Sequence, residues 1–357
     1  MRRLILTVLA ALLLVTPALA ADLPRDLTRS VPAGGEDILT LGDLSDAGGF
    51  AVGVVHLLEK VRREVGDILR QRVRGAAAVL LVVTLCAAVE NFYQGEGKAA
   101  PYLPMAGALS VTALTAGSLD SLIGLGAETI GELSLFSKAL LPTLAAAAAA
   151  SGAVATASFQ QVSTVFLVDL LLNLIHGLLL PLVYLYIGVL AAGACMAEDR
   201  LAAIAEGLKR IITWLLTSAL LLFTVYLSVA RVVTGAADGA TVKVTKAAIS
   251  GVVPVVGGII AEAADTVLAG AGMLKNSIGV FGMLAILSAC VYPFLQLGVQ
   301  YLLFKLTAFL AGALGVKGLR GLIDGLGGAF GLVLGMTGSC ALLLLVSVLS
   351  SLAVVMP

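Results

Sequence analysis

Three polar residues interrupt a long apolar stretch and share one side of the helix that this stretch predicts. They are Asp169, Asn173 and His176, at positions i, i+4 and i+7. Polar and ionisable side chains inside a membrane are costly, so each needs a partner or a function. One interpretation is a path for an ion, a proton or a substrate. The other is interhelical hydrogen bonding that holds a helix bundle together.

A second unusual stretch, residues 241–282, combines a helix breaker with charged side chains. Its proline has no backbone N–H to donate and would kink or break a helix. Irregular backbone at membrane depth is tolerated only where protein buries it or water lines it. The pattern predicts a broken or re-entrant segment near residues 249–276. The residues concerned are Pro254, Gly257, Gly258, Glu262, Asp265, Lys275 and Asn276.

The charged groups of this stretch allow two interpretations. Glu262 and Asp265 stand at i and i+3 on one helix face, and together with Lys275 they could line a pathway. Equally, the segment could be a structural turn in which Asp265 or Glu262 pairs with Lys275.

The sequence contains none of the common enzyme motifs. There is no GxxxxGK[ST] phosphate loop, no HExxH zinc motif and no GxSxG elbow, and the chain has only two histidines. Glu262 and Asp265 belong to one segment, which does not match a protease dyad contributed by two helices. We therefore predict a non-enzymatic protein without catalytic residues, cofactor or bound metal.

Composition places most of the chain in lipid. It is 60% hydrophobic and 12% charged, against about 45–50% and about 25% in soluble domains. A net charge of +0 argues against a nucleic-acid partner. Because a spanning helix needs about 20 apolar residues, we predict an all-α polytopic membrane protein with six to eight segments. The apolar blocks are residues 76–89, 99–117, 139–157, 164–194, 211–230, 249–272, 277–313 (long enough for one tilted helix and a second) and 327–355.

The N-terminus is predicted to be a cleavable signal peptide over residues 1–20. Arg2 and Arg3 precede a short apolar region, and Ala18-Leu19-Ala20 forms a small-x-small cleavage site. Residues 21–49 are polar and contain proline and glycine pairs. We expect them to form an extracytoplasmic arm.

Residues 50–74 predict an amphipathic basic helix, which precedes a polytopic membrane domain over residues 75–357. Apolar residues recur on one face, whereas six lysine and arginine residues between Lys60 and Arg74 crowd the other. Such a helix either lies in the headgroup layer or packs on the membrane domain or a partner. The signal peptide places it on the outer side, against the positive-inside rule.

Small residues repeat at four-residue spacing near the C-terminus, at Gly327, Gly331, Gly335 and Ser339. Such a stripe favours close helix packing, either within the chain or between copies in a homo-oligomer. The four cysteines are far apart and form no CxxC pair, so we predict neither disulfides nor metal ligands. They are Cys86, Cys195, Cys290 and Cys340.

The stretch around residues 238–276 resembles the signature of the stage III sporulation protein AE family. Two further blocks resemble the family pattern, and together the resemblance covers residues 75–357. The family usually has Asp where Glu262 stands. The resemblance is carried by Asp238-Gly239, Thr241, Lys246, Val253–Gly258, Ala264–Val267 and Leu274–Asn276, by Leu140-Leu141-Pro142 with the alanine-rich run to Gly152, and by Asn173 with Leu180-Pro181-Leu182.

This resemblance implies a role in endospore formation. Family members act in the mother-cell membrane around the engulfed forespore, within an assembly that includes ring-forming proteins and a secretion-type ATPase. That assembly forms a channel that supports late forespore gene expression. The alternative is a stand-alone small-molecule or ion transporter, using Asp169, His176, Glu262, Asp265 and Lys275.

Overall fold

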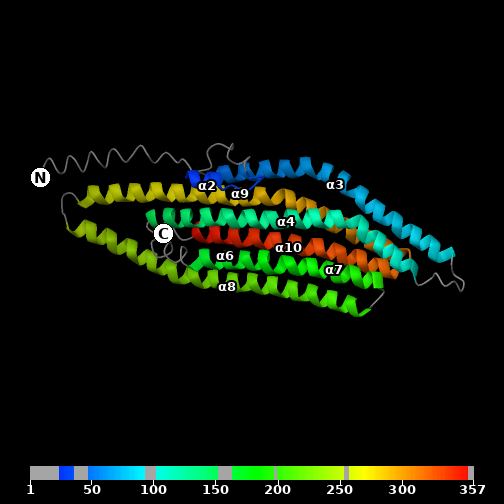
Figure 1. Cartoon of the computed structure of the whole chain (residues 1–357). Coiled ribbons are helices and arrows are strands. Elements are labelled where there is room, and N and C mark those ends of the chain that lie inside the picture. Colours follow the sequence, from blue (N-terminus) through cyan, green and yellow to red (C-terminus); the bar gives the residue numbers. More distant parts are fainter. Residues whose placement is uncertain are drawn as a thin grey trace.

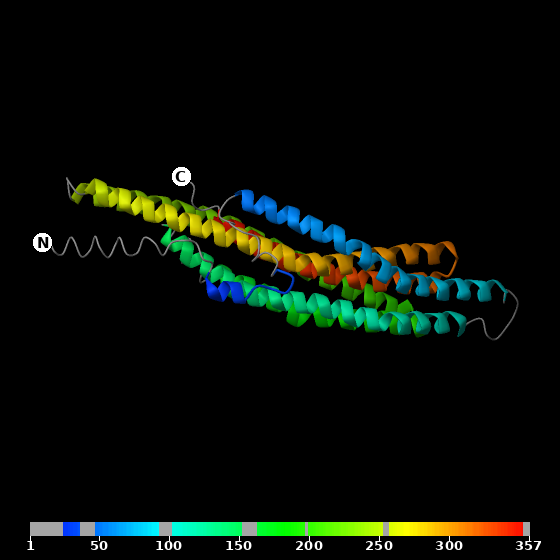
Figure 2. The same ribbon diagram turned by 90° about the horizontal axis from the view of Figure 1, so that it is seen from above.

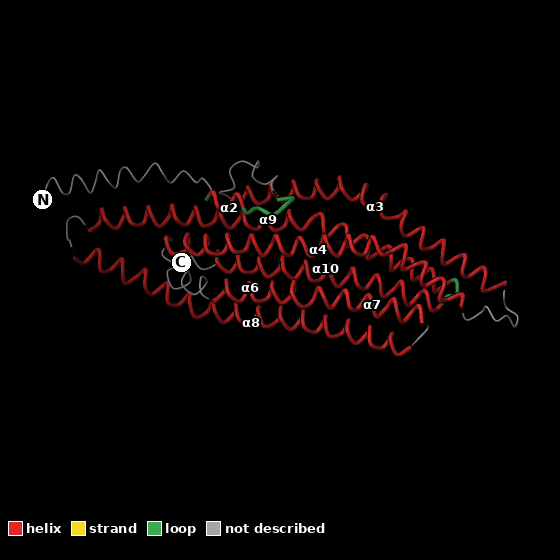
Figure 3. The backbone as a smooth tube through the Cα atoms, viewed as in Figure 1, coloured by secondary structure: helices red, strands yellow, loops and turns green. Residues whose placement is uncertain are grey.

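The computed structural model describes residues 24–35, 47–92, 102–151, 163–196, 199–252 and 257–352, with the backbone alone over residues 231–271. Its regular structure in these ranges is entirely helical (Figures 1 and 3), which confirms the all-α class. The elements are α2 (Arg25–Arg29), α3 (Ala47–Phe92), α4 (Tyr102–Ala150), α6 (Val165–Leu174), the π-helical turn η4 (Ile175–Leu179), α7 (Leu180–Met196), α8 (Asp199–Val252), α9 (Gly257–Ala313) and α10 (Lys317–Leu352).

Six helices in the described part of the chain are long and apolar enough to cross a membrane. Large apolar side chains on their outer surfaces are exposed, including Phe166 at 68%, Trp214 at 66% and Phe309 at 70%. Lipid tails solvate such surfaces, so these faces require no cover from protein. The six spans agree with the predicted multi-pass architecture. They are 50–90, 102–150, 165–196, 200–230, 272–313 and 318–352.

Successive long helices run antiparallel and lie side by side (Figures 1 and 2). Helix α10 is central, because it packs against α4, α7, α8 and α9, while α3 covers α9 and α4. Phe304 of α9 meets Phe330 of α10 edge to face, with ring centroids 5.3 Å apart. Both rings are fully buried, so this contact packs α9 firmly against α10 near the connection between the two helices.

The glycine stripe of α10 packs within the chain. A Cβ atom on Gly327 would come within 3.1 Å of Phe304, and one on Gly331 within 3.0 Å of Tyr301, both on α9. Gly335 faces α8 instead. Of the two interpretations of the stripe, the structure therefore supports packing inside one chain, and these glycines provide no argument for a homo-oligomer.

Neighbouring blocks that the sequence pattern separates are joined in single helices. The basic stretch 50–74 and the apolar block 76–89 both belong to α3, and blocks 99–117 and 139–157 both fall largely in α4. The prediction of a second helix within 277–313 is wrong, because α9 continues through Pro293. Proline inside a membrane helix is tolerated where neighbouring helices and side chains surround the freed carbonyl.

Helices α8 and α9 form a hairpin that projects beyond the ends of the other helices (Figures 1 and 2). Helix α8 ends at Val252 and α9 begins at Gly257, which agrees with a helix break near Pro254. Pro254 itself lies outside the described residues. From Gly257 onward the backbone is one continuous helix, so the predicted irregularity does not extend to residue 276.

Candidate functional site in the helical bundle

Asp169 joins α6 to α4. Its carboxylate lies 3.1 Å from the Nζ atom of Lys138 and accepts a hydrogen bond from Asn173 Nδ2 at 3.2 Å. This is the interhelical bonding offered by the second interpretation of the sequence. Within the described residues, no hydrogen bond or ion pair connects His176 to either partner, and His176 is exposed. The structure thus brings together two of the three predicted residues.

The turn that contains His176 is wider than an α-helical turn, because the N–H of Leu180 donates to the carbonyl of Ile175. Such π-turns are rare and often occur at functional sites. Here the next residue provides a cause. Pro181 has no N–H to donate, and its ring would clash with the carbonyl of Gly177 in a regular α-helix. The wide turn therefore follows from the proline and does not by itself mark a site.

Lys275 is almost completely buried, with 1% of its surface exposed. Its Nζ atom lies 3.5 Å from the carbonyl of Leu352, the last residue of α10. The C-terminal end of a helix carries partial negative charge, so a cation is favourable there. Lys275 therefore ties α9 to the end of α10. Asn276, beside it, is exposed.

The backbone does not favour the second interpretation of this stretch, in which Lys275 pairs with Glu262 or Asp265. All three residues belong to the continuous helix α9. A rise of about 1.5 Å per residue puts Asp265 about 15 Å from Lys275 along the axis, and Glu262 further still. Side chains cannot bridge that separation. Both carboxylates are placed on the projecting hairpin, away from the contact that Lys275 makes.

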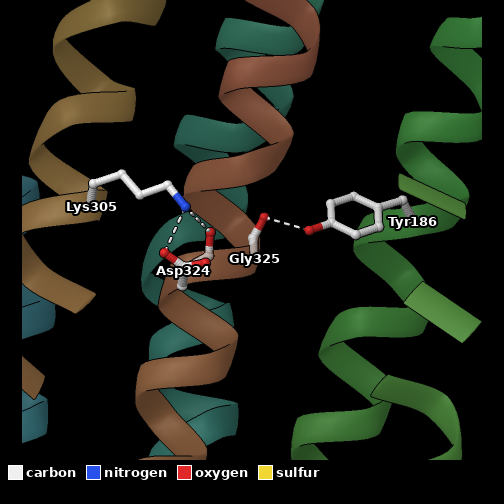
Figure 4. Close-up of polar contacts among 4 residues, drawn as sticks. All are labelled: Tyr186, Lys305, Asp324 and Gly325. Carbon is white, nitrogen blue, oxygen red and sulfur yellow. Dashed lines mark hydrogen bonds and ion pairs between the residues drawn. The ribbon is translucent and has the colours of Figure 1, made fainter. Parts of the chain in front are cut away.

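Two contacts fix α10 near its N-terminal end (Figure 4). The Nζ atom of Lys305 on α9 donates to Asp324 Oδ1 at 2.6 Å and approaches the Asp324 carbonyl at 3.4 Å. From the opposite side, the buried hydroxyl of Tyr186 on α7 donates to the carbonyl of Gly325 at 2.9 Å. Sequence reasoning missed these contacts. The available signal was that Lys305 and Asp324 carry opposite charges on either side of a short connection.

A polar stripe on α9 consists of Ser288, Tyr292, Gln296 and Gln300, at four-residue spacing. Gln296 accepts a hydrogen bond from Arg72 Nε on α3 at 2.8 Å and donates to the Tyr292 hydroxyl at 2.9 Å. Sequence reasoning also missed this stripe, although its spacing could have shown it. It connects the basic helix to the centre of the bundle.

The described part of the N-terminal arm docks among α3, α4 and α9. The carbonyl of Gly34 accepts hydrogen bonds from Lys60 Nζ at 3.0 Å and from Ser288 Oγ. The backbone N–H of Ala33 donates to Glu132 Oε2 at 3.1 Å. Gly34 has φ of +82°, a conformation that costs other residues energy. A pocket of about 300 Å³ lies beneath this loop.

The described residues contain no group of three or more His, Cys, Asp or Glu side chains placed to hold a metal ion. All four cysteines are free thiols, and three of them are buried. Most side-chain hydroxyls of the described helices donate to a backbone carbonyl three or four residues earlier in their own helix, as Thr115, Ser137 and Thr337 do. A smaller set of polar contacts joins one helix to another. These interhelical contacts position helices, and among the described residues they include no nucleophile paired with a base.

The comparisons with known proteins point to one family. A family model described as stage III sporulation protein AE matches residues 46–354, which include all six spanning helices. A relative from Bacillus subtilis (strain 168), described as stage III sporulation protein AE, is 28% identical over 203 residues, or 57% of this chain. The aligned part covers 51% of that relative, so the chain spans about half the length of the curated relative it matches. No solved structure matches the chain significantly. With nearly the whole helical bundle inside the family match, the chain belongs to the stage III sporulation protein AE family.

Proposed function

We propose that the protein is a non-enzymatic membrane component of a secretion-like channel complex that links the mother cell to the forespore. The observation that carries the proposal is the family match over residues 46–354, combined with six helices able to span a membrane. In this proposal the protein resides in the mother-cell membrane around the forespore. It supports late forespore gene expression and spore development.

The proposed partners are the ring-forming proteins and the secretion-type ATPase of the same complex. The α8–α9 hairpin supports this part of the proposal, because it projects beyond the other helices (Figure 1). It also carries the stretch in which the family resemblance is densest, including Pro254, Glu262 and Asp265. A projecting element is free to contact another protein while the bundle stays in the membrane.

The alternative, a stand-alone transporter, finds less support. Asp169 is bound to Lys138 and Asn173, and Lys275 lies against the C-terminal end of α10. These contacts favour structural roles for two of the residues that such a pathway would use.

A clean deletion of the gene in its sporulating host tests the proposal. We expect forespores to complete engulfment but fail to express a late forespore reporter, and spore counts to fall. The chain expressed in trans should restore both. Normal reporter activity and spore counts in the deletion strain would contradict the proposal.

A second measurement separates the channel component from the transporter. The purified protein is reconstituted alone in liposomes, and uptake of ions and small solutes is followed. We expect no uptake by the isolated protein, together with recovery of ring-forming proteins when it is purified from sporulating cells. Selective uptake by the protein alone would support the transporter instead.

A further inference from the structure

A second pocket, of about 450 Å³, opens at the end of the bundle where α7 ends and α8 and α10 begin. Its volume lies within the range of about 300–1,000 Å³ that is typical of ligand sites. Small residues line much of it, so that α7, α8 and α10, together with the start of α4 at Pro104, leave room between them. They include Gly193 and Ala194 of α7, Ala202 of α8, and Gly318 and Gly321 of α10.

Two opposite charges line this pocket without pairing. Lys209 and Glu206 stand three residues apart on one face of α8. Within the described residues, neither side chain makes a hydrogen bond or an ion pair. Lys209 is half-buried and Glu206 is exposed. The pocket therefore offers a cation deeper in the wall and a carboxylate nearer to solvent.

The ammonium of Lys209 converges with a second polar group. A Cβ atom built on Gly328 of α10 would lie 3.7 Å from Lys209 Nζ and 3.3 Å from the Tyr186 hydroxyl. Asp324 also lines the pocket, but Lys305 already holds its carboxylate at 2.6 Å (Figure 4). Because the half-buried Lys209 makes no ion pair, an anionic oxygen from a ligand would be stabilised beside its ammonium.

The depth of the pocket in the membrane follows from a neighbouring aromatic. Trp214, the single tryptophan of the chain, lies five residues beyond Lys209 on α8 and is 66% exposed. Tryptophan is enriched where the membrane meets water, at the level of the lipid headgroups. Exposed Ile204 and Ile211 share the opposite face of α8 from Lys209 and Glu206, so that face offers apolar surface to lipid while the charged face lines the pocket.

We propose that this pocket binds the headgroup of a phospholipid that carries a primary ammonium, such as phosphatidylethanolamine. The phosphate oxygens accept hydrogen bonds from Lys209, and the ammonium donates to Glu206. Residues three apart on a helix are neighbours, about 5–6 Å between Cβ atoms. That separation suits a phosphate and an ammonium joined by two carbons. The acyl chains extend from the mouth of the pocket into the surrounding lipid.

The full-length protein, purified in detergent and stripped of lipid, is titrated with phosphatidylethanolamine, phosphatidylglycerol or phosphatidylcholine, and bound lipid is counted by native mass spectrometry. We expect preferential binding of phosphatidylethanolamine. Lys209→Gln should weaken it by about tenfold, the loss expected for a charge-assisted hydrogen bond. Glu206→Gln should remove the preference over phosphatidylglycerol, because that lipid has no ammonium to place.

Two further variants make the test specific. Arg210→Gln removes the adjacent, exposed cation that does not line the pocket, and it should leave binding unchanged. Gly321→Leu should abolish binding by filling the pocket, since a Cβ atom there meets open space and no charge is altered. Size-exclusion profiles matching the unmodified protein verify that each variant is folded.

Equal binding of all three lipids, or an equal loss with Arg210→Gln and Lys209→Gln, would overturn the proposal. Free O-phosphoethanolamine offers the same headgroup without acyl chains. Displacement of bound lipid by this compound at the lipid's own concentration would overturn the assignment to a membrane lipid, in favour of a soluble ligand.

Discussion

Lys305 of α9 and Asp324 of α10 form an ion pair at 2.6 Å that closes the connection between the two central helices. The same lysine lies 5.7 Å from the ring centre of Tyr301. Helices α9 and α10 pack against each other. The Lys305–Asp324 pair therefore fixes their relative register at one end, and the contact of Lys275 with Leu352 lies at the other end.

Breaking this ion pair should weaken the bundle modestly. Asp324→Asn and Lys305→Gln are each expected to cost about 1 kcal/mol, because both side chains are partly exposed and such pairs are screened. The double variant should cost little more than either single one. Thermal unfolding in detergent of the unmodified protein, the two single variants and the double variant measures this double-mutant cycle.

The surface pair of Arg63 and Glu59 is the matched control. Its atoms are 3.8 Å apart and both side chains are more than half exposed, so its loss should be barely measurable. Equal effects of the two pairs, or additive effects at Lys305 and Asp324, would contradict a coupled contact.

Two glycines in α4 should respond oppositely to alanine. Gly126 packs directly against Val333 of α10, leaving no space for a Cβ atom, whereas one on Gly124 would meet open space. Gly126→Ala is expected to destabilise by about 1–3 kcal/mol through overpacking. Gly124→Ala should be neutral or stabilising by roughly 0.5–1 kcal/mol, because alanine favours helix. Melting temperatures in detergent report both, and a stabilised Gly126→Ala variant would refute this packing.

The carboxylates of the projecting hairpin should be dispensable for stability. Glu262 and Asp265 are too far along α9 to pair with Lys275. We therefore expect Glu262→Gln and Asp265→Asn to accumulate normally in the membrane but to reduce spore counts. Lys275→Ala should lower accumulation instead, since it leaves a buried contact with α10 unmade. Quantitative immunoblots measure accumulation of each variant, and spore counts measure its function. Loss of the Asp265→Asn protein from the membrane would show that this carboxylate is needed for stability after all.

Six crossings return the chain to the side on which it starts. If the signal peptide places the arm outside the cytoplasm, the end of α10 lies outside as well. Alkaline phosphatase fused after Leu352 should therefore be active. A fusion at residues 197–198, after three crossings, should be inactive. The reverse pattern would show that the chain is inserted in the opposite orientation.

The class of fold could be predicted from the sequence because lipid solvation depends on composition and on the length of apolar blocks. The ends of helices were harder to predict. Charged residues such as Arg70 divide a hydropathy pattern, yet the helical backbone continues through them since its hydrogen bonds are local. Proline alone did not decide where a helix ends, because Pro254 lies between the end of α8 and the start of α9, whereas α9 continues through Pro293.

The polar contacts were predictable only where partners are close in sequence. Asp169 and Asn173 lie one turn apart, and their spacing shows that they face each other. Arg72 and Gln296 are separated by 224 residues, so their contact exists only once α3 and α9 have packed. Lys275 illustrates the same limit. Its contact is with the carbonyl of Leu352, far along the chain, and the nearer carboxylates Glu262 and Asp265 are out of its reach along α9.

The docking of the N-terminal arm has a consequence for biogenesis. Gly34 emerges early from the ribosome, but the serine that binds it is 254 residues further along the chain. The arm reaches its final position only after the fifth spanning helix has been inserted. Until then the hydrogen bond between the Gly34 carbonyl and Ser288 of the polar stripe cannot form. Protection of the arm from an added protease would therefore report, in a timed synthesis experiment, the moment at which α9 joins the bundle.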